Sequence, residues 1–142
     1  MFSVGFREIV LIVDDVEVAT RFYSEIVGLE IARADSVWAW LHAGDPDDRQ
    51  WLALHKGTLL FERQPAAPLG ERWGPVHFAF RVPRSKLEEA ANHVRSKGVE
   101  VFGPVDPGMG RLPEGDLDGH ALGYYFYDPD GNLLEFYAYP DE

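Results

Sequence analysis

The chain has 142 residues, of which 46% are hydrophobic and none is cysteine, and its formal net charge is -11. This length suits one domain, or two small modules that share a core. The lack of cysteine excludes disulfides, thiolate ligands and a cysteine nucleophile. The negative charge argues against nucleic acid as a partner, because phosphate binding needs clustered Lys and Arg. No apolar run has the length of a membrane span, and no secretory leader is recognisable, so we expect a cytoplasmic location without membrane partners.

The first half of the sequence predicts one helix among several strands. Residues 6–13 are apolar and β-branched, which is typical of a buried strand. Apolar residues then recur at helical spacing over residues 16–27, Asp14 and Glu17 form a capping pattern before them, and Gly28 suits the end of this helix. A polar turn is predicted at 45–48, and a Pro/Gly-rich connection at 64–74 follows the last strand of this half. Further strands are predicted over residues 29–33, 36–43, 51–56 and 58–63.

The second half repeats this order of elements. A strand is predicted over residues 76–82, and the spacing Ser85-x-x-Glu88 predicts a capped helix that ends at Gly98. The apolar stripe of this helix consists of Leu87, Ala90, Ala91 and Val94. Two aromatic strands then flank the turn Asp128-Pro-Asp-Gly131, in which proline presets one φ angle and glycine supplies a positive one.

Internal similarity suggests that the two halves are copies of one unit. Gly98-Val-Glu-Val101 resembles Gly28-Leu-Glu-Ile31, and Gly57-Thr-Leu-Leu-Phe61 resembles Gly131-Asn-Leu-Leu-Glu135. We therefore predict an α+β fold of two tandem βαβββ modules, at about 5–64 and 75–140 of a single domain 1–142. Their sheets would form a curved mixed β-sheet cup with the helices outside. Residues 103–119, with eight Gly or Pro, interrupt the pattern and are either a solvated loop or a lid over this cup.

Glu135 is the most informative residue of the final strand. Side chains alternate between two faces over residues 132–139, and Glu135 shares its face with Leu133 and Tyr137. An unpaired carboxylate is costly to bury among aromatic residues. Glu135 therefore meets water, pairs with a cation or binds a metal.

The paired units resemble the vicinal oxygen chelate superfamily, which contains glyoxalases, bleomycin-resistance proteins, fosfomycin-modifying enzymes and extradiol dioxygenases. The resemblance covers essentially the whole chain. It rests on Phe22-Tyr23-x3-Val27-Gly28-Leu29 in the first half and on Tyr125-x-x-Asp128-Pro-Asp-Gly131-x3-Glu135 in the second. It implies a glyoxalase-like fold, whereas function has to be argued from the site, because this fold hosts unrelated chemistries.

The resemblance also implies a metal site. Its ligand positions fall on Glu8, Phe61, His77 and Glu135, and Phe61 cannot ligate a metal, as in the three-ligand branches of the family. Glu8 stands where histidine is usual. The remaining set of Glu8, His77 and Glu135 suits Mn, Zn, Mg or Fe in the divalent state, although the loss of one histidine counts against dioxygen chemistry.

Several further residues are candidates for the site. Tyr125 matches a tyrosine that dioxygenase members place near the metal, and it is either a proton or hydrogen-bond donor or a strand aromatic with its hydroxyl in water. His120, which is predicted to begin the strand after the glycine-rich stretch, is the best candidate among the other histidines for an acid–base group or for a group that orients a metal ligand. Arg81 is an alternative partner for Glu135 that needs no metal. The four tryptophans are core or interface residues, or stacking surfaces for a planar ligand.

Two functions compete on these observations. The first is a divalent-metal-dependent enzyme, of the lyase, isomerase or dioxygenase type, acting on a small oxygen-bearing substrate such as a 2-oxo compound, a diol or an epoxide. Its catalytic residues would be Tyr125, His120 and Glu135. The alternative is a metal-free protein that binds a small molecule, such as a cationic drug, in the manner of bleomycin resistance. In both cases the resemblance and the exposed sheet edges predict a homodimer.

Overall fold

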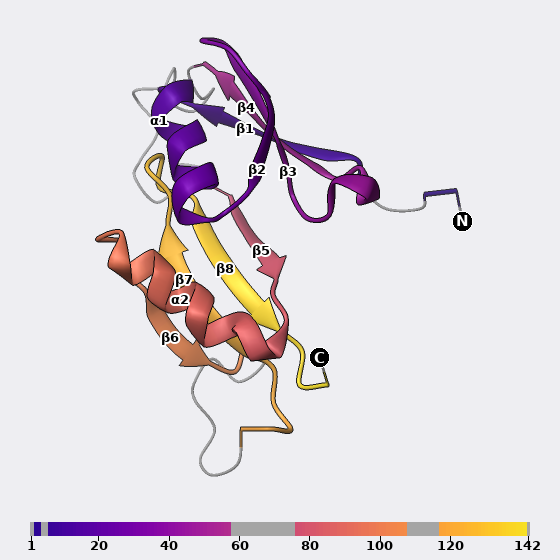
Figure 1. Cartoon of the computed structure of the whole chain (residues 1–142), viewed down its shortest axis with the longest axis vertical. Helices are drawn as coiled ribbons and strands as arrows, with labels where there is room; N and C mark the ends of the chain where they lie inside the picture. The colour runs from indigo at the N-terminus through magenta and orange to yellow at the C-terminus, as the bar shows by residue number, and fades with distance from the viewer. Residues whose placement is uncertain (1, 4–5, 58–75, 108–116, 142) are drawn as a thin grey trace, which may run out of the picture. The chain divides into compact units, whose positions relative to one another are not determined.

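The computed structural model of the chain describes residues 2–3, 6–57, 76–107 and 117–141. It divides into two compact units, Met1–Gly74 and Pro75–Glu142. Each unit contains one four-stranded sheet and one main helix (Figure 1). The predicted α+β class of two βαβββ units is confirmed, because both units have the same order of elements.

The first unit is built on a mixed sheet of strand order β1-β4-β3-β2. β1 and β4 are parallel, and the other neighbours are antiparallel. The main helix, α1, continues into a π-helical turn, η1, and a 3-10 turn, η2, joins β3 to β4. The bounds are β1 Glu8–Val13, α1 Val16–Arg21, η1 Phe22–Ile26, β2 Glu30–Ala34, β3 Trp38–His42, η2 Pro46–Asp48 and β4 Trp51–Lys56.

The helix of the first unit covers one face of its sheet. Asp15, rather than the expected Asp14, caps α1 by accepting a hydrogen bond of 3.0 Å from the backbone of Val18. α1 packs on β3 and β4. The fully buried side chains on this face are mainly aliphatic, and they explain why the sheet and helix form together. They include Leu11, Val13, Val16, Ala19, Tyr23, Leu41, Leu52 and Leu54.

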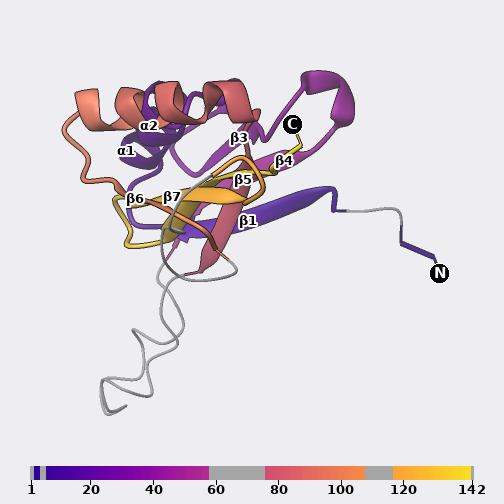
Figure 2. The ribbon, with the colours of Figure 1, turned by 90° about the horizontal axis from the view of Figure 1, so that it is seen from below.

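The second unit repeats the topology, with strand order β5-β8-β7-β6. β5 and β8 are parallel, and the other pairs are antiparallel. Figure 2 shows α2 lying across one face of this sheet. The bounds are β5 His77–Arg81, η5 Arg84–Lys86, α2 Leu87–Ser96, β6 Phe102–Val105, β7 Leu122–Tyr127 and β8 Leu133–Ala138.

The turn between β7 and β8 fixes the start of β5 as well. Asp128 accepts hydrogen bonds from the backbone of Asp130 and Asn132 at 2.9 and 2.8 Å, and Gly131 has the expected positive φ of 83°. The side-chain oxygen of Asn132 in turn accepts a bond of 3.1 Å from the backbone N–H of Val76. This bond ties the residue before β5 to the start of β8, so the turn helps to place His77 beside β8.

Three predictions about local structure were wrong. Ser85 and Glu88 do not form a capping box, because Arg84–Lys86 is a 3-10 turn and the cap of α2, Lys86, makes no side-chain capping bond. His120 lies in a turn before β7 and not in the strand. The expected loop at 103–119 begins later, because residues 103–105 belong to β6; its residues 108–116 lie outside the described part of the chain.

The register also corrects how the two halves correspond. In each unit the strand that runs parallel to the first strand is the fourth, so β4 is the counterpart of β8. The match of residues 57–61 with 131–135 therefore does not reflect equivalent strands. Phe61 and the predicted strand at 58–63 lie outside the described residues. In addition, no helix in the described part is long and apolar enough to cross a membrane.

Candidate functional site

His77 and Glu135 meet on the face of the second sheet that α2 does not cover. His77 is the first residue of β5, and Glu135 is the third residue of β8. The two side chains approach to 3.5 Å, measured from Nε2 of His77 to Oε2 of Glu135. The other ring nitrogen, Nδ1, lies 3.0 Å from the carbonyl oxygen of Leu133. Because a carbonyl oxygen only accepts, Nδ1 carries a proton, and Nε2 is the nitrogen that faces the carboxylate.

Glu135 is buried although it lies on the open face. It is 5% exposed, and its Oε1 has no hydrogen-bond partner among the described residues. Burial raises the pKa of this carboxyl, while contacts with Tyr125 and His77 act in the opposite direction. A buried carboxylate with an unsatisfied oxygen is costly, so this site favours a proton or a cation beside Glu135.

Gly123 provides the space for this carboxylate. A Cβ atom built at Gly123 would collide with Oε1 of Glu135 and would lie 3.2 Å from a side-chain carbon of Pro107. Gly123 lies on β7, two residues before Tyr125 and diagonally across from Glu135. The sequence analysis did not single out Gly123; a glycine inside an aromatic strand is the signal that could have revealed a close approach.

Tyr125 stands directly opposite Glu135 in the β7–β8 register. Its ring lies 6.1 Å from that of His77. Burial, followed by hydrogen bonding to Glu135, raises the pKa of Tyr125 to about 12. Tyr125 is therefore a half-buried phenol that keeps its proton at neutral pH and faces the carboxylate, which is the arrangement that a hydrogen-bond donor requires.

His120 forms a second polar pair with Asp106. Nδ1 of His120 donates to Oδ2 of Asp106 at 2.8 Å, and Asp106 is only 8% exposed. Arg84 holds the turn that carries His120, because its guanidinium donates to the carbonyls of His120 and Leu117, each at 2.8 Å. Burial raises the pKa of Tyr137, which shares a face with Glu135, and nearby charged groups that include Asp106 add to this rise. Asp106 was not predicted from the sequence.

Glu8 belongs to the first unit. It is the first residue of β1, as His77 is of β5, and it is an exposed residue whose carboxylate lies 3.6 Å from Arg7. By register, Ala53 on β4 occupies the place that Glu135 occupies on β8. Ala53 cannot ligate a metal, so of these two corresponding positions in the first sheet only Glu8 can supply a ligand. Among the described residues, no three His, Asp or Glu side chains are gathered as a metal-binding group.

Arg81 does not reproduce the predicted pair with Glu135. It stands opposite Tyr137 in the register, and its guanidinium carbon lies 5.8 Å from the ring centre of Tyr139. The contacts that shift the pKa of Glu135 come from Tyr125 and His77. Arg81 thus makes a cation–π contact with the exposed ring of Tyr139.

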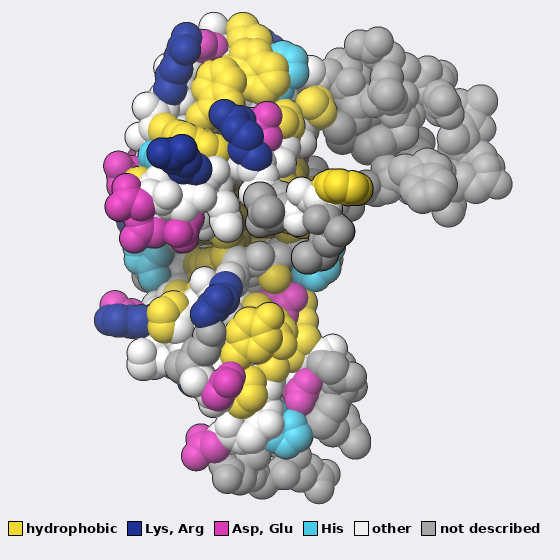
Figure 3. Space-filling model, turned by 90° about the vertical axis from the view of Figure 1, so that its right-hand side faces the viewer, with side chains coloured by type: hydrophobic (Ala, Val, Ile, Leu, Met, Phe, Trp, Pro, Cys, Tyr) yellow, Lys and Arg dark blue, Asp and Glu magenta, His cyan; other side chains and the backbone are white. Residues whose placement is uncertain are grey.

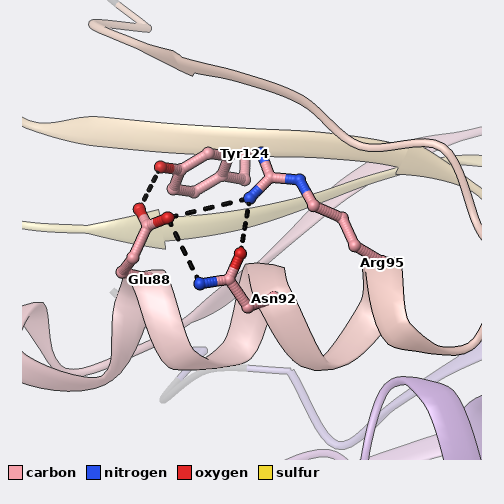
Figure 4. A network of polar contacts seen from close by, with 4 residues as sticks. All are labelled: Glu88, Asn92, Arg95 and Tyr124. Carbon is pink, nitrogen blue, oxygen red and sulfur yellow. Dashed lines mark hydrogen bonds and ion pairs between the residues drawn. The ribbon is translucent and has the colours of Figure 1, made fainter.

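The helix-covered face of the same sheet carries a separate polar network, drawn in Figure 4. The hydroxyl of Tyr124 donates to Glu88 on α2, and the guanidinium of Arg95 lies 5.2 Å from the Tyr124 ring. Arg95 also donates to Asn92 at 2.9 Å. Burial raises the pKa of Tyr124 to about 12, with a further contribution from Glu88. Successive tyrosines of β7 thus serve different faces, one in α2 packing and one beside Glu135.

Comparison with known proteins places this architecture in a family. The model of the Glyoxalase/Bleomycin resistance protein/Dioxygenase superfamily matches residues 5–136. The chain belongs to this superfamily, whose members bind small-molecule substrates. The resemblance seen in the sequence is therefore confirmed.

Similar proteins differ in their activities. The fosfomycin resistance protein FosX of Listeria monocytogenes is 28% identical over 94% of this chain and 89% of its own length. Biphenyl-2,3-diol 1,2-dioxygenase 3 of Rhodococcus globerulus is 27% identical over 87% of this chain and 59% of its own. Among solved structures, the integron cassette protein HFX_CASS4 from a sewage-outfall metagenome is 30% identical, with a TM-score of 0.68 over 96% of this chain and 99% of its own.

Proposed function

We propose that the chain is a divalent-metal-dependent enzyme that acts on a small oxygen-bearing substrate. The observation that carries the proposal is the pair of His77 and Glu135. The imidazole of His77 turns its Nε2 toward a buried carboxylate whose second oxygen has no partner among the described residues. A cation or a proton between Nε2 and this carboxylate, which are 3.5 Å apart, would hold the two groups together.

The ligand types fit a divalent metal. His77 supplies an imidazole whose other nitrogen is oriented by a carbonyl, which is the usual support of a metal-binding histidine. We propose Glu8 as the third ligand, because it occupies on β1 the place that His77 occupies on β5. One imidazole and two carboxylates suit Mn, Zn, Mg or Fe. When bound, such a metal would hold substrate oxygens and stabilise the negative charge that develops on them.

The remaining residues of the second unit supply proton chemistry. Tyr125 keeps its proton at neutral pH and can donate a hydrogen bond to a substrate oxygen. His120 donates from Nδ1 to Asp106, so its Nε2 is the nitrogen that can accept a proton. A buried carboxylate behind the imidazole fixes this tautomer and orients the ring. We propose Tyr125 as the hydrogen-bond donor and His120 as the acid–base group.

The relatives suggest which substrates to test. The fosfomycin resistance protein FosX points to fosfomycin, and the dioxygenase points to an aromatic diol. The FosX structure of L. monocytogenes was solved with Mn(II) and sulfate, which supports manganese as the first metal to try. Glu8 replaces a histidine that iron oxygenases favour. We therefore expect the Mn(II)-loaded protein to consume fosfomycin, and we do not expect the Fe(II)-loaded protein to consume oxygen in the presence of an aromatic diol.

Metal-induced stabilisation tests the ligand set without requiring a substrate. Titration of chelator-treated protein with Mn(II), followed by thermal unfolding, should raise the Tm progressively, because a ligand that binds only the folded state adds about 2.7 kcal/mol at one hundred times its Kd. Glu8→Gln should need more metal for the same rise, whereas Glu17→Gln, on exposed α1, should match the wild type. Equal titrations of wild type and Glu8→Gln would remove Glu8 from the set.

A second candidate function is metal-free binding of a small molecule, and one observation favours it. The open face of the first sheet carries a row of stacked rings, in which Trp38 lies 5.1 Å from Trp40 and 4.0 Å from His55. If this is the whole function, metal should neither raise the Tm nor change the affinity for a ligand. A rise in Tm that is lost in His77→Ala would decide for the metal enzyme.

A further inference from the structure

The first unit contains a cavity of about 330 Å³ that the proposed metal chemistry does not use. It opens between β2, β3, β4 and the residue before β1. Two tryptophans and two arginines form most of its wall. The lining residues are Arg7, Ala32, Arg33, Trp40 and Trp51.

The two tryptophans of the cavity are held by other rings. Trp40 stacks on Trp38 with an angle of 9° between their planes, and Trp38 stacks in turn on His55. Trp51 lies 4.4 Å from the ring of His42. Both indoles are half-buried and their neighbours restrict how they turn. The cavity therefore offers ordered aromatic surfaces, on which a planar ring can stack at a low entropic cost.

The charge of the cavity wall is opposite to that of the chain. The guanidinium carbon of Arg33 lies 5.7 Å from the ring centre of Trp40, and Arg7 makes an exposed contact of 3.6 Å with Glu8. No carboxylate is among the lining residues. In the upper part of Figure 3, which is the first unit, basic side chains lie beside hydrophobic ones. Guanidinium groups next to indoles suit an anion attached to a planar ring.

We propose that this cavity binds a planar aromatic molecule that carries one acidic group. The ring would stack against Trp40 and Trp51, and the acidic group would accept hydrogen bonds from Arg33 and Arg7. A volume near the lower end of small-molecule sites limits the ligand to one or two fused rings. None of the proposed metal ligands lines the cavity, although Glu8 contacts Arg7 at its wall, so we expect the ligand to bind without a metal.

The net charge of -11 by itself suits a cationic or neutral ligand. That charge is a property of the whole surface and affects solubility and long-range attraction. Affinity at a site depends on the groups that touch the ligand, and here these are arginines. For this cavity we therefore expect an anionic aromatic ligand, and not the cationic drug that was considered from the sequence.

Tryptophan fluorescence gives a direct test with a matched set of probes. The probes are 2-naphthoate, the uncharged 2-naphthamide and the cationic 2-naphthylmethylammonium. We expect saturable quenching by 2-naphthoate and at least tenfold weaker binding of the other two, because a charge-assisted hydrogen bond is lost. Binding should be unchanged by chelator and in His77→Ala.

Variants of the cavity wall separate this site from non-specific quenching. Arg33→Gln should lower the affinity for 2-naphthoate by about tenfold or more. Arg21→Gln, on the exposed last turn of α1, should leave this affinity unchanged. Trp40→Phe, which keeps a ring, should retain more affinity than Trp40→Leu, with circular dichroism confirming that both fold. Equal affinity for the three probes, unchanged binding in Arg33→Gln, or quenching that does not saturate would each overturn the proposal.

Discussion

Gly123 lies against the carboxylate of Glu135, and any larger residue at this place would occupy the position of Oε1. The neighbour on its other side is Pro107, whose ring carbon would be 3.2 Å from a new Cβ. Because Glu135 is confined between β5 and β7, its position depends on the lack of a side chain at Gly123. Space as well as charge thus determines how the carboxylate is held.

Gly123→Ala should therefore displace Glu135 and weaken metal binding. The methyl group overfills a packed site, which typically costs about 1–3 kcal/mol of stability. Gly119→Ala is the matched control, because a Cβ there meets no atom within 4 Å. Both can be followed by thermal unfolding with and without Mn(II). Similar metal-induced rises in Tm for the two variants would refute the close packing of Gly123 against Glu135.

The pH dependence of stability should report the burial of Glu135. Burial raises the pKa of this carboxyl above its ordinary value of 4.5, so the folded state binds its proton more tightly than the unfolded state. Its stabilising contribution is present below pH 4.5 and is lost as the pH rises through the folded pKa. Chelator-treated wild type should therefore lose stability relative to Glu135→Gln as the pH increases.

Denaturant unfolding across this pH range measures the difference between the two proteins. Added metal should reverse the trend for the wild type, because a metal ligand must be deprotonated and metal binding strengthens with pH. Glu135→Gln should show no such gain. Parallel pH profiles for both proteins without metal would contradict the shift of the Glu135 pKa.

The adjacent tyrosines of β7 should have separable effects. Tyr125→Phe removes a donor that lowers the pKa of Glu135, so we expect that pKa to rise further and metal affinity to fall by roughly 10–100-fold. Tyr124→Phe removes the bond to Glu88 on the other face and should cost about 1 kcal/mol of stability without changing metal affinity. The measurements are metal titration and denaturant unfolding of both variants. If Tyr124→Phe alone lost metal affinity, the placement of Tyr124 on the α2-covered face and of Tyr125 on the face of Glu135 would be contradicted.

We also expect a homodimer. The two edge strands of the first sheet expose Ile9, Val10 and Ile31, each more than 40% accessible, and natural proteins usually cover such edges. Sedimentation at micromolar concentration should give about twice the chain mass of 16.0 kDa. Ile31→Lys should shift the equilibrium toward the monomer, whereas Val18→Lys on α1 should not. A mass near 16.0 kDa with metal still bound would show that the dimer is not needed.

Much of the fold can be predicted from the sequence, because its signals are local. Helical spacing before Gly28 and Gly98, and the turn at Asp128–Gly131, correctly give the type and order of most elements. The alternation around Glu135 also predicts the face on which it lies. These features depend on residues a few positions apart, where sequence patterns and backbone geometry are directly linked.

The missing parts depend on pairing between distant residues. Residues 57–61 resemble residues 131–135 in sequence. Strand equivalence is set instead by the parallel pairing of β1 with β4, which makes Ala53, and not Phe61, the counterpart of Glu135. The bond between Asp106 and His120 joins residues 14 positions apart across a Gly/Pro-rich stretch. Ser85 and Glu88 have the spacing of a capping box, but the carboxylate of Glu88 accepts a hydrogen bond from Tyr124 instead. Tertiary contacts override local preference in each case.

Metal content is the most direct test of the central claim that His77 and Glu135 hold a divalent metal. Protein purified without chelators, or loaded with Mn(II) and dialysed, should contain close to one metal per chain by elemental analysis. His77→Ala should lose it, whereas His93→Ala, exposed on α2, should keep it. A wild-type protein that stays empty after loading with Mn, Zn, Mg and Fe, or a His77→Ala variant with undiminished metal, would contradict the account.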